Sequence, residues 1–467
     1  MSLIQSAIIM PRRAVYLSLC VVIGAMLWQA RASSRVDSAR AMWLWNPSPM
    51  LTGADARAAF FDFLDHEHIT VVWAQVGTEG PNLKFAAEWR RLIAEATRRR
   101  VKIEALDGAP TYAIQEEIPK RVVESVLAYN ESADPDQRFS GIHFDIEPYL
   151  LWAWRSPQGR QQVLRRYLDL LQWCRRRMDN EFPGMKLGVD IPFWWQSTDA
   201  RTGRAIGDVA FNGETKAASF HVIDMLDNVG IMNYRNRAAG PNGMVALGED
   251  LLVYADRARK TAIWMGVETS RDDASPVWFA IGLPKDVAAV ALEAADITPD
   301  RQYKGFKLTA FDDGASVHLG LGLRGMDPAR PSAAFMSALA ELARTLGVLS
   351  RPGPADRGDQ SRARAMRSLA ADPEWQKPTA RTIVDPETGK EYPGVVADNV
   401  MLAILTFEGS PLEVFRRELA AADAAFAKHP SYRGLAIHHY ESYRALVNGA
   451  GPMPSLIAIP TAAAPRY

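Results

Sequence analysis

The stretch GIHFDIEPY, residues 141–149, carries the clearest strand pattern of this chain. Side chains alternate along a strand, so the apolar residues at positions 142, 144 and 146 share one face, whereas His143, Asp145 and Glu147 share the other. Pro148 lacks the N–H group that a strand ladder needs, so a strand over 139–147 ends there. Glu147 is therefore expected at the carboxyl end of a strand, where parallel barrels carry their functional residues.

Short strand signals alternate with helical patterns along most of the chain. Each strand candidate is rich in β-branched or aromatic residues and is bounded by turn residues. The eight strands are expected over residues 41–46, 69–76, 101–107, 139–147, 185–193, 229–234, 262–268 and 434–440. Strands that alternate with helices favour a parallel sheet, and eight of them predict a (β/α)8 TIM barrel.

The segment between the seventh and eighth strands is too long for a loop and carries structure of its own. Strand-like runs over 304–311 and 316–323 flank the hairpin signal Asp312-Asp313-Gly314, so a small α+β insertion is expected there. The expected division of the chain is a signal peptide or anchor (1–32), barrel strands one to seven (38–275), the α+β insertion (276–347), a linker or irregular lobe (348–399), barrel helix seven and strand eight (400–450), and a C-terminal tail (451–467).

Composition and charge narrow the class of protein. The chain has 467 residues, of which 48% are hydrophobic, so it can bury a sizeable core. Lys+Arg and Asp+Glu both count 54, and this balance argues against a nucleic-acid partner. Arg12 and Arg13 precede an apolar run over 14–28 and the small residues around Ala30 and Ala32. This pattern predicts export to a periplasmic or extracellular location, with membrane contact only through this segment if it stays uncleaved.

The fourth strand resembles the signature of the family 18 glycoside hydrolases, the chitinase-like TIM barrels. Their pattern is Asp-Gly-x-Asp-x-Asp-x-Glu, and residues 140–147 of this chain read SGIHFDIE. The last two acidic positions match, which implies that Glu147 is the general acid and that Asp145 orients the 2-acetamido group of the substrate. The first two acidic positions hold Ser140 and His143 instead.

The sixth strand extends this resemblance. Met232-Asn233-Tyr234 matches a pattern that the family often carries, whereas Arg235 stands where the family has an acid or an amide. Breaking a glycosidic bond needs a proton on the leaving oxygen and stabilisation of a cationic anomeric carbon. The resemblance implies that the sugar's acetamido oxygen is the nucleophile. We expect Tyr234 to donate to the acetamide and His143, directly below Asp145, to hold Asp145 ionised.

Aromatic and polar residues near successive strand ends predict a site for an oligo- or polysaccharide, because sugar rings stack on aromatic faces. The expected substrate-binding residues are His143, Trp45, Trp73, Asp190, Trp194, Asn233, Glu268, His438 and Tyr440. No cofactor is expected, because no glycine-rich phosphate loop follows a strand. No metal is expected either, because His438 and His439 lack spaced partners that would complete a ligand set.

Two alternatives remain open. Glu147-Pro148 together with Glu268, at the end of the seventh strand, resembles the retaining barrels with paired glutamates, in which the carboxyl groups lie about 5 Å apart. The other alternative is a catalytically silent barrel that binds glycans or partners, with His143 and Arg235 marking the loss of catalysis. The unaltered Asp145 and Glu147 favour a secreted glycoside hydrolase acting on N-acetylhexosamine-containing glycans.

Overall fold

The computed structural model describes most of the chain from Ala39 onward. The described residues are 39–199, 202–258, 261–270, 277–284, 288, 292, 297, 302–312, 316–322, 331–349, 356–371, 375–385, 387–399 and 402–449. The expected signal peptide or anchor over 1–32 and the expected tail over 451–467 lie outside them.

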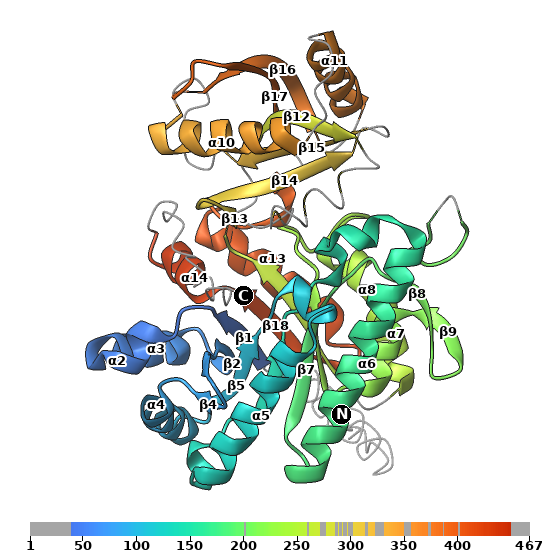
Figure 1. The fold of residues 1–467 in the computed structure, drawn as a ribbon. Helices are drawn as coiled ribbons and strands as arrows, with labels where there is room; N and C mark the ends of the chain where they lie inside the picture. The colour runs from blue at the N-terminus through green and yellow to red at the C-terminus, as the bar shows by residue number, and fades with distance from the viewer. Residues whose placement is uncertain are drawn as a thin grey trace, which may run out of the picture. The chain divides into compact units, whose positions relative to one another are not determined.

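Eight parallel strands close into a barrel (Figure 1). They are β1 (Ala39–Leu44), β2 (Ile69–Gln75), β5 (Lys102–Asp107), β6 (Gly141–Phe144), β7 (Lys186–Pro192), β10 (Asn228–Met232), β11 (Ala262–Glu268) and β18 (Tyr432–His438). β18 pairs with β1 on one side and with β11 on the other, so the last strand closes the barrel. The predicted (β/α)8 architecture is confirmed.

Helices connect these strands and cover the outside of the barrel. They are α2 (Ser48–Thr52), α3 (Ala54–His66), α4 (Ala86–Arg98), α5 (Glu117–Ser132), α6 (Pro157–Glu181), α7 (Ala218–Met225), α8 (Met244–Ala258), α12 (Leu402–Leu405), α13 (Leu412–Phe426) and α14 (Tyr440–Val447). Two short hairpins lie in the loops, β3 (Thr78–Glu79) with β4 (Asn82–Leu83), and β8 (Asp208–Phe211) with β9 (Glu214–Ala217). Helix α6 begins at Pro157, because the Ser156 side chain accepts from the Gly159 N–H at 3.0 Å and proline is favoured in a first turn.

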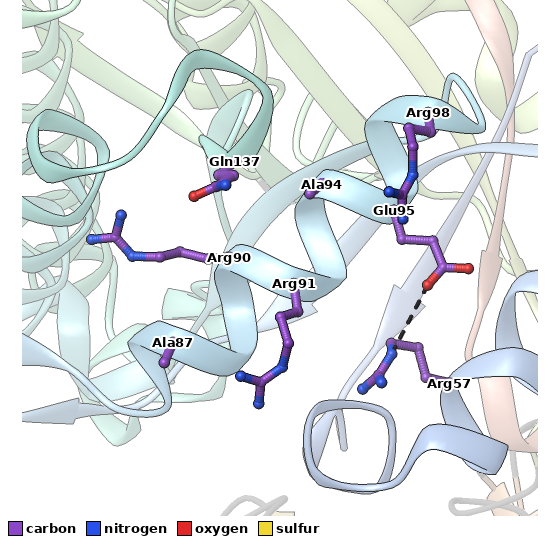
Figure 2. Close-up of a pocket in the computed structure, with 8 residues that line it drawn as sticks. All are labelled: Arg57, Ala87, Arg90, Arg91, Ala94, Glu95, Arg98 and Gln137. Carbon is purple, nitrogen blue, oxygen red and sulfur yellow. Dashed lines mark ion pairs between the residues drawn. The ribbon is translucent and has the colours of Figure 1, made fainter.

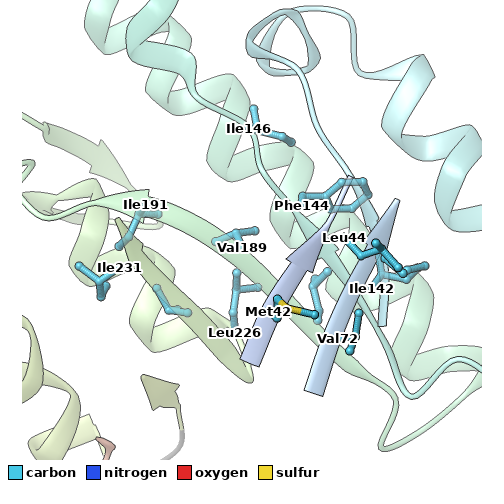
Figure 3. Close-up of a cluster of buried hydrophobic side chains, with 14 of the residues drawn as sticks. Met42, Leu44, Val72, Ile142, Phe144, Ile146, Val189, Ile191, Leu226 and Ile231 are labelled. Carbon is cyan, nitrogen blue, oxygen red and sulfur yellow. The ribbon is translucent and has the colours of Figure 1, made fainter. Parts of the chain in front are cut away.

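The outer core lies between the barrel strands and the helices. The apolar side chains of residues 142, 144 and 146 are all buried in it, together with others from β1, β2, β7 and β10 (Figure 3). Burying one such side chain contributes about 1.5–3 kcal/mol. β6 itself is shorter than the expected strand over 139–147, because after Phe144 the chain turns into a 3-10 helix, η3 (Pro148–Leu150).

The inside of the barrel is filled by tryptophan and by buried polar groups. The His143 ring stacks on Trp73 with centroids 3.9 Å apart. Two glycines make room for this layer, because a Cβ on Gly188 would lie 2.5 Å from His143 Nδ1 and one on Gly230 would overlap Asp190 Oδ1. The alternation of residues along β6 therefore places its polar face inside the barrel.

A second sheet is inserted between β11 and β18. Its six strands run in the order β13-β14-β15-β12-β17-β16, with bounds β12 (Val277–Pro284), β13 (Gln302–Tyr303), β14 (Phe306–Asp312), β15 (Ser316–Gly322), β16 (Trp375–Val384) and β17 (Glu391–Asn399). Helices α10 (Ala333–Leu349) and α11 (Asp356–Ala371) accompany it. Apolar residues from the inserted strands and helices form a separate core that includes Leu308, Leu319 and Phe335.

The structure corrects the expected linker or irregular lobe over 348–399. Within the described residues this segment contains α11, β16 and β17, and the two strands belong to the inserted sheet. The linker interpretation came from the Arg, Pro, Asp and Gly content of residues 348–395, which is typical of loops. Proline has no N–H to donate to a neighbouring strand. In β17 the residues that pair with β12 are 395–397, and Pro393 lies beyond that pairing.

Candidate functional site

Asp145 and Glu147 lie immediately after β6, at the carboxyl end of the barrel. The Asp145 N–H donates to the Asp107 carbonyl at 3.0 Å, which fixes the chain just past the end of the strand. A Cβ on Gly108 would overlap the Asp145 carbonyl oxygen, so only glycine lets the loop after β5 pass this close. Glu147 precedes η3 with φ −105° and ψ 72°, which ends the extended backbone.

Asp145 is a half-buried acid beside other acids. Burial first, and then the charges of Glu147 and Asp190, raise the pKa of Asp145 well above its ordinary value. Its Oδ1 atom is buried and has no hydrogen-bond partner among the described residues. Buried polar atoms are nearly always hydrogen-bonded, so an unpaired carboxyl oxygen at a strand end is a marker of a binding position. The raised pKa also corrects the expectation that His143 holds Asp145 ionised.

Glu147 is held by an aromatic neighbour. The Tyr149 hydroxyl donates to Glu147 Oε1, and the Tyr149 ring lies edge-on to Trp194 with centroids 5.3 Å apart. Burial and the nearby Glu147 charge raise the pKa of Tyr149, so this hydroxyl stays a donor. The predicted Trp194 is half-buried and is thereby linked to Glu147 through Tyr149.

Tyr234 lies among the acidic residues of the site. Burial first raises its pKa well above the ordinary value, and the charges of Glu268, Asp145, Asp190 and Glu147 raise the pKa of Tyr234 further. The charges of four carboxyl groups therefore act on this one phenol. Tyr234 therefore remains a neutral hydrogen-bond donor at any pH near neutrality.

Glu268, His438 and Trp45 form a hydrogen-bonded chain across the ends of β11, β18 and β1. Trp45 Nε1 donates to His438 Nε2 at 2.9 Å, and His438 Nδ1 lies 2.9 Å from Glu268 Oε2. An indole N–H can only donate, so His438 is the neutral tautomer with its proton toward Glu268. Burial lowers the pKa of His438 but the Glu268 carboxylate outweighs it, so the pKa of His438 is raised on balance. The Ser270 N–H donates to Glu268 Oε1 at 2.6 Å, so both oxygens of this carboxylate have partners.

Three residues predicted to bind substrate lie inside the barrel instead. His143, Trp73 and Asp190 are each at most 1% exposed, so no glycan can reach them. His143 Nε2 lies 3.0 Å from Asp190 Oδ1 without hydrogen-bond alignment, and Trp43 Nε1 donates to Asp190 Oδ2 at 2.9 Å. These groups form the layer beneath Asp145, and Asp190 acts on Asp145 by its charge.

Two further predicted binding residues face the helices. The Asn233 side chain is fully buried and donates to the Met244 carbonyl at 2.6 Å, at the start of α8. Tyr440 is 2% exposed and packs edge-on against Phe60, with centroids 5.1 Å apart. Both lie next to the end of a barrel strand, where the alternation of side chains no longer predicts their direction.

Two residues at the site were not predicted from the sequence. Tyr149 stands two residues after Glu147, the candidate acid, and this spacing was the feature of the sequence that could have indicated it. Asp107 ends β5 and accepts hydrogen bonds from the Gly108 N–H at 2.9 Å and from the Tyr112 hydroxyl at 3.0 Å. Its place at the carboxyl end of a neighbouring strand was the available signal.

Asp107 gives the protein a pH-dependent stability. Burial raises the pKa of Asp107 from 3.8 to about 6, although two hydrogen bonds oppose the rise. A raised carboxyl pKa contributes stability that is complete below the unfolded value and is lost as pH rises through about 6. Two pKa units correspond to about 3 kcal/mol.

We expect Asp107→Asn to remove this part of the pH dependence. Between about pH 4 and about pH 8, the free energy of unfolding of the wild type should fall by up to about 3 kcal/mol more than that of the variant. Denaturant unfolding at both pH values measures the difference, with the exposed Asp62→Asn as the control. An equal fall in the free energy of unfolding of the wild type and of Asp107→Asn would contradict the raised pKa of Asp107.

Within the described residues, no three or more His, Cys, Asp or Glu side chains gather in a way that could hold a metal ion. The helices of the described part of the chain also lack the length and apolar character needed to span a bilayer.

Comparison with known proteins finds neighbours among solved structures only. No protein-family model matches the chain, and no curated protein matches it. Chitinase ChiW from Paenibacillus sp. str. FPU-7 is similar over 88% of this chain and 32% of its own, with 11% identity and a TM-score of 0.38. A class V chitinase from Pseudomonas fluorescens Pf-5 is similar over 67% and 93%, with 12% identity and a TM-score of 0.31.

A third neighbour is the spore cortex-lytic enzyme SleL from Bacillus megaterium QM B1551. It covers 66% of this chain and 68% of its own, with 13% identity and a TM-score of 0.31. Because these TM-scores lie below 0.5, the fold rests on the closed strand order of the barrel and the function rests on the site.

Proposed function

We propose that this protein is an exported glycoside hydrolase that cleaves glycans containing 2-acetamido sugars. The observation that carries the proposal is the Asp145 carboxyl group: its pKa is raised, its buried Oδ1 has no partner among the described residues, and it lies beside Glu147. An acetamide N–H is a donor of the kind that this oxygen lacks.

The acid pair supplies the proton. Two neighbouring carboxyl groups disfavour double ionisation, and the raised pKa of Asp145 favours one proton held by the pair. When substrate binds, this proton passes to Glu147, which delivers it to the leaving glycosidic oxygen. Asp145 is then ionised, accepts the acetamide N–H and balances the positive charge that develops on the ring.

The substrate supplies the nucleophile in this scheme. The acetamido oxygen attacks the anomeric carbon as the glycosidic bond breaks, which forms a cyclic oxazolinium. Tyr234 remains protonated and can donate to the same acetamide. Water then opens the ring, and the Glu147 carboxylate takes its proton, which restores the acid.

The paired-glutamate scheme has weaker support. A nucleophilic carboxylate needs an oxygen open toward the anomeric carbon. In Glu268 the two oxygens are engaged by His438 and by the Ser270 N–H, so this residue is better suited to holding His438 and Trp45 in place.

The silent-barrel alternative rests on His143 and Arg235, and both have structural roles. Arg235 Nη1 donates to the Tyr234 carbonyl at 2.7 Å, and its Nε donates to Asn242 Oδ1 at 3.0 Å. Its guanidinium also lies over the Phe193 ring at 5.0 Å. An arginine fixed this way positions the backbone of Tyr234, so its presence does not signify lost catalysis.

Cleavage of defined oligosaccharides tests the proposal. We expect the purified protein to release reducing ends from N-acetylglucosamine oligomers and not from the same oligomers after de-N-acetylation, because the nucleophile has then been removed. Tight binding of the acetylated oligomer without release of reducing ends would support the silent barrel. Release from plain hexose oligomers would support the two-glutamate scheme.

A further inference from the structure

A basic groove lies on the outer face of α4, away from the strand ends. Its volume is about 540 Å³, and Figure 2 shows α4 between Arg57 of α3 and Gln137 of η2 (Pro135–Gln137). The groove is lined by Arg57, Ala87, Arg90, Arg91, Ala94, Glu95, Arg98 and Gln137. The lining thus holds four guanidinium groups and one carboxylate.

The spacing of the lining residues produces an extended basic stripe. Ala87, Arg91, Ala94 and Arg98 follow each other at intervals of four, three and four residues, so they share one helix face. This face is opposite the buried residues of α4, which include Trp89 and pack into the core. At 1.5 Å per residue the stripe is about 16 Å long.

The lining carries more guanidinium charge than its one carboxylate can neutralise. Glu95 is balanced by Arg99, whose Nη2 lies 3.2 Å away, and by Arg57, whose Nε lies 4.0 Å away. Arg91 pairs with Glu88 at 3.0 Å, outside the lining. Arg98 has neither a hydrogen bond nor an ion pair among the described residues, and it is exposed. The groove therefore keeps guanidinium groups available for an anion.

One wall of the groove is held rigidly. Both terminal nitrogens of Arg90 are fixed on Ser132, to its carbonyl at 2.8 Å and to its hydroxyl at 3.0 Å. A fixed guanidinium loses less conformational entropy when a ligand binds beside it.

We propose that this groove binds an acidic polysaccharide, with carboxylates paired to Arg91 and Arg98 and sugar rings over Ala87 and Ala94. Guanidinium groups match carboxylates in a two-pronged geometry, and the Gln137 amide can bond sugar hydroxyls. A single small anion would leave most of the volume empty, and the zero net charge of the chain disfavours nucleic acid. The choice of a sugar polymer rests on the proposed function, whereas the anion site does not.

Binding of oligogalacturonate to the full chain tests the site. We expect calorimetry to show binding that weakens as NaCl is raised, and about three- to thirtyfold weaker binding by Arg91→Gln with Arg98→Gln. The matched control is Arg121→Gln with Arg165→Gln, two exposed arginines on α5 and α6 that remove the same charge. Unchanged affinity in the first double variant, or an equal loss in the control, overturns the proposal.

Two further measurements identify the ligand class and the place where it binds. Polyphosphate binding as tightly as oligogalacturonate would overturn the choice of a polysaccharide. An N-acetylglucosamine oligomer should not displace bound oligogalacturonate, and displacement would place the ligand at the barrel site and overturn the groove. Arginine-dependent binding by a protein that cleaves no glycan would leave the groove intact and defeat only the proposed hydrolase.

Discussion

Replacing Glu147 with glutamine is expected to lower the turnover of N-acetylglucosamine oligomers about 10²–10⁴-fold, which is the usual contribution of general acid catalysis. The amide keeps the shape of the side chain and can still accept the Tyr149 hydroxyl, but it carries no acidic proton. Stability should change little, because the hydrogen bond to Tyr149 is retained. Initial rates of reducing-end release measure the effect.

The control for this prediction is Glu131→Gln, the same substitution at an exposed position of α5. It should leave turnover at the wild-type level. Calorimetric titration of the inactive Glu147→Gln variant should show substrate binding close to that of the wild type. Unchanged turnover in Glu147→Gln would end the hydrolase proposal, since no other residue in the scheme supplies the proton.

Asp145→Ala is expected to lower turnover by about 10²–10³-fold, nearly as much as the loss of Glu147. The substitution removes the oxygen that would orient the acetamide and the charge that would balance the oxazolinium. It also removes the group whose raised pKa favours a proton held by the pair. The wild-type rate should therefore decline at high pH as this proton is lost, and Asp145→Ala should not show the same decline.

Glu268→Ala separates the two catalytic schemes. If Glu268 positions His438 and Trp45, its loss should mainly raise KM while kcat stays close to the wild type. If it is the nucleophile, kcat should collapse and Asp145→Ala should be the milder change. Parallel kinetics of the two variants on acetylated and plain oligomers would decide which scheme holds.

The sequence alone was sufficient for the barrel and for the position of its acid pair. The period of two along 141–147 places one face of β6 in the outer core and the other inside the barrel, because backbone geometry fixes that alternation locally. The break at Pro148 likewise predicted Glu147 at the carboxyl end of the strand, and the structure ends β6 three residues earlier, at Phe144. Closure by a strand near residue 434 followed from the alternation of strand and helix patterns.

Which side chains reach the site depends on the tertiary structure. Trp73 and His143 share the polar face of the barrel, but they lie too deep, because neighbouring strands fill the interior in layers. Asn233 and Tyr440 turn toward helices, since past a strand end the direction of a side chain depends on packing rather than on period. The strand order of the inserted sheet, which β16 and β17 join from a later segment, and the approach of Arg57 and Gln137 to α4 likewise depend on tertiary contacts that no local pattern carries.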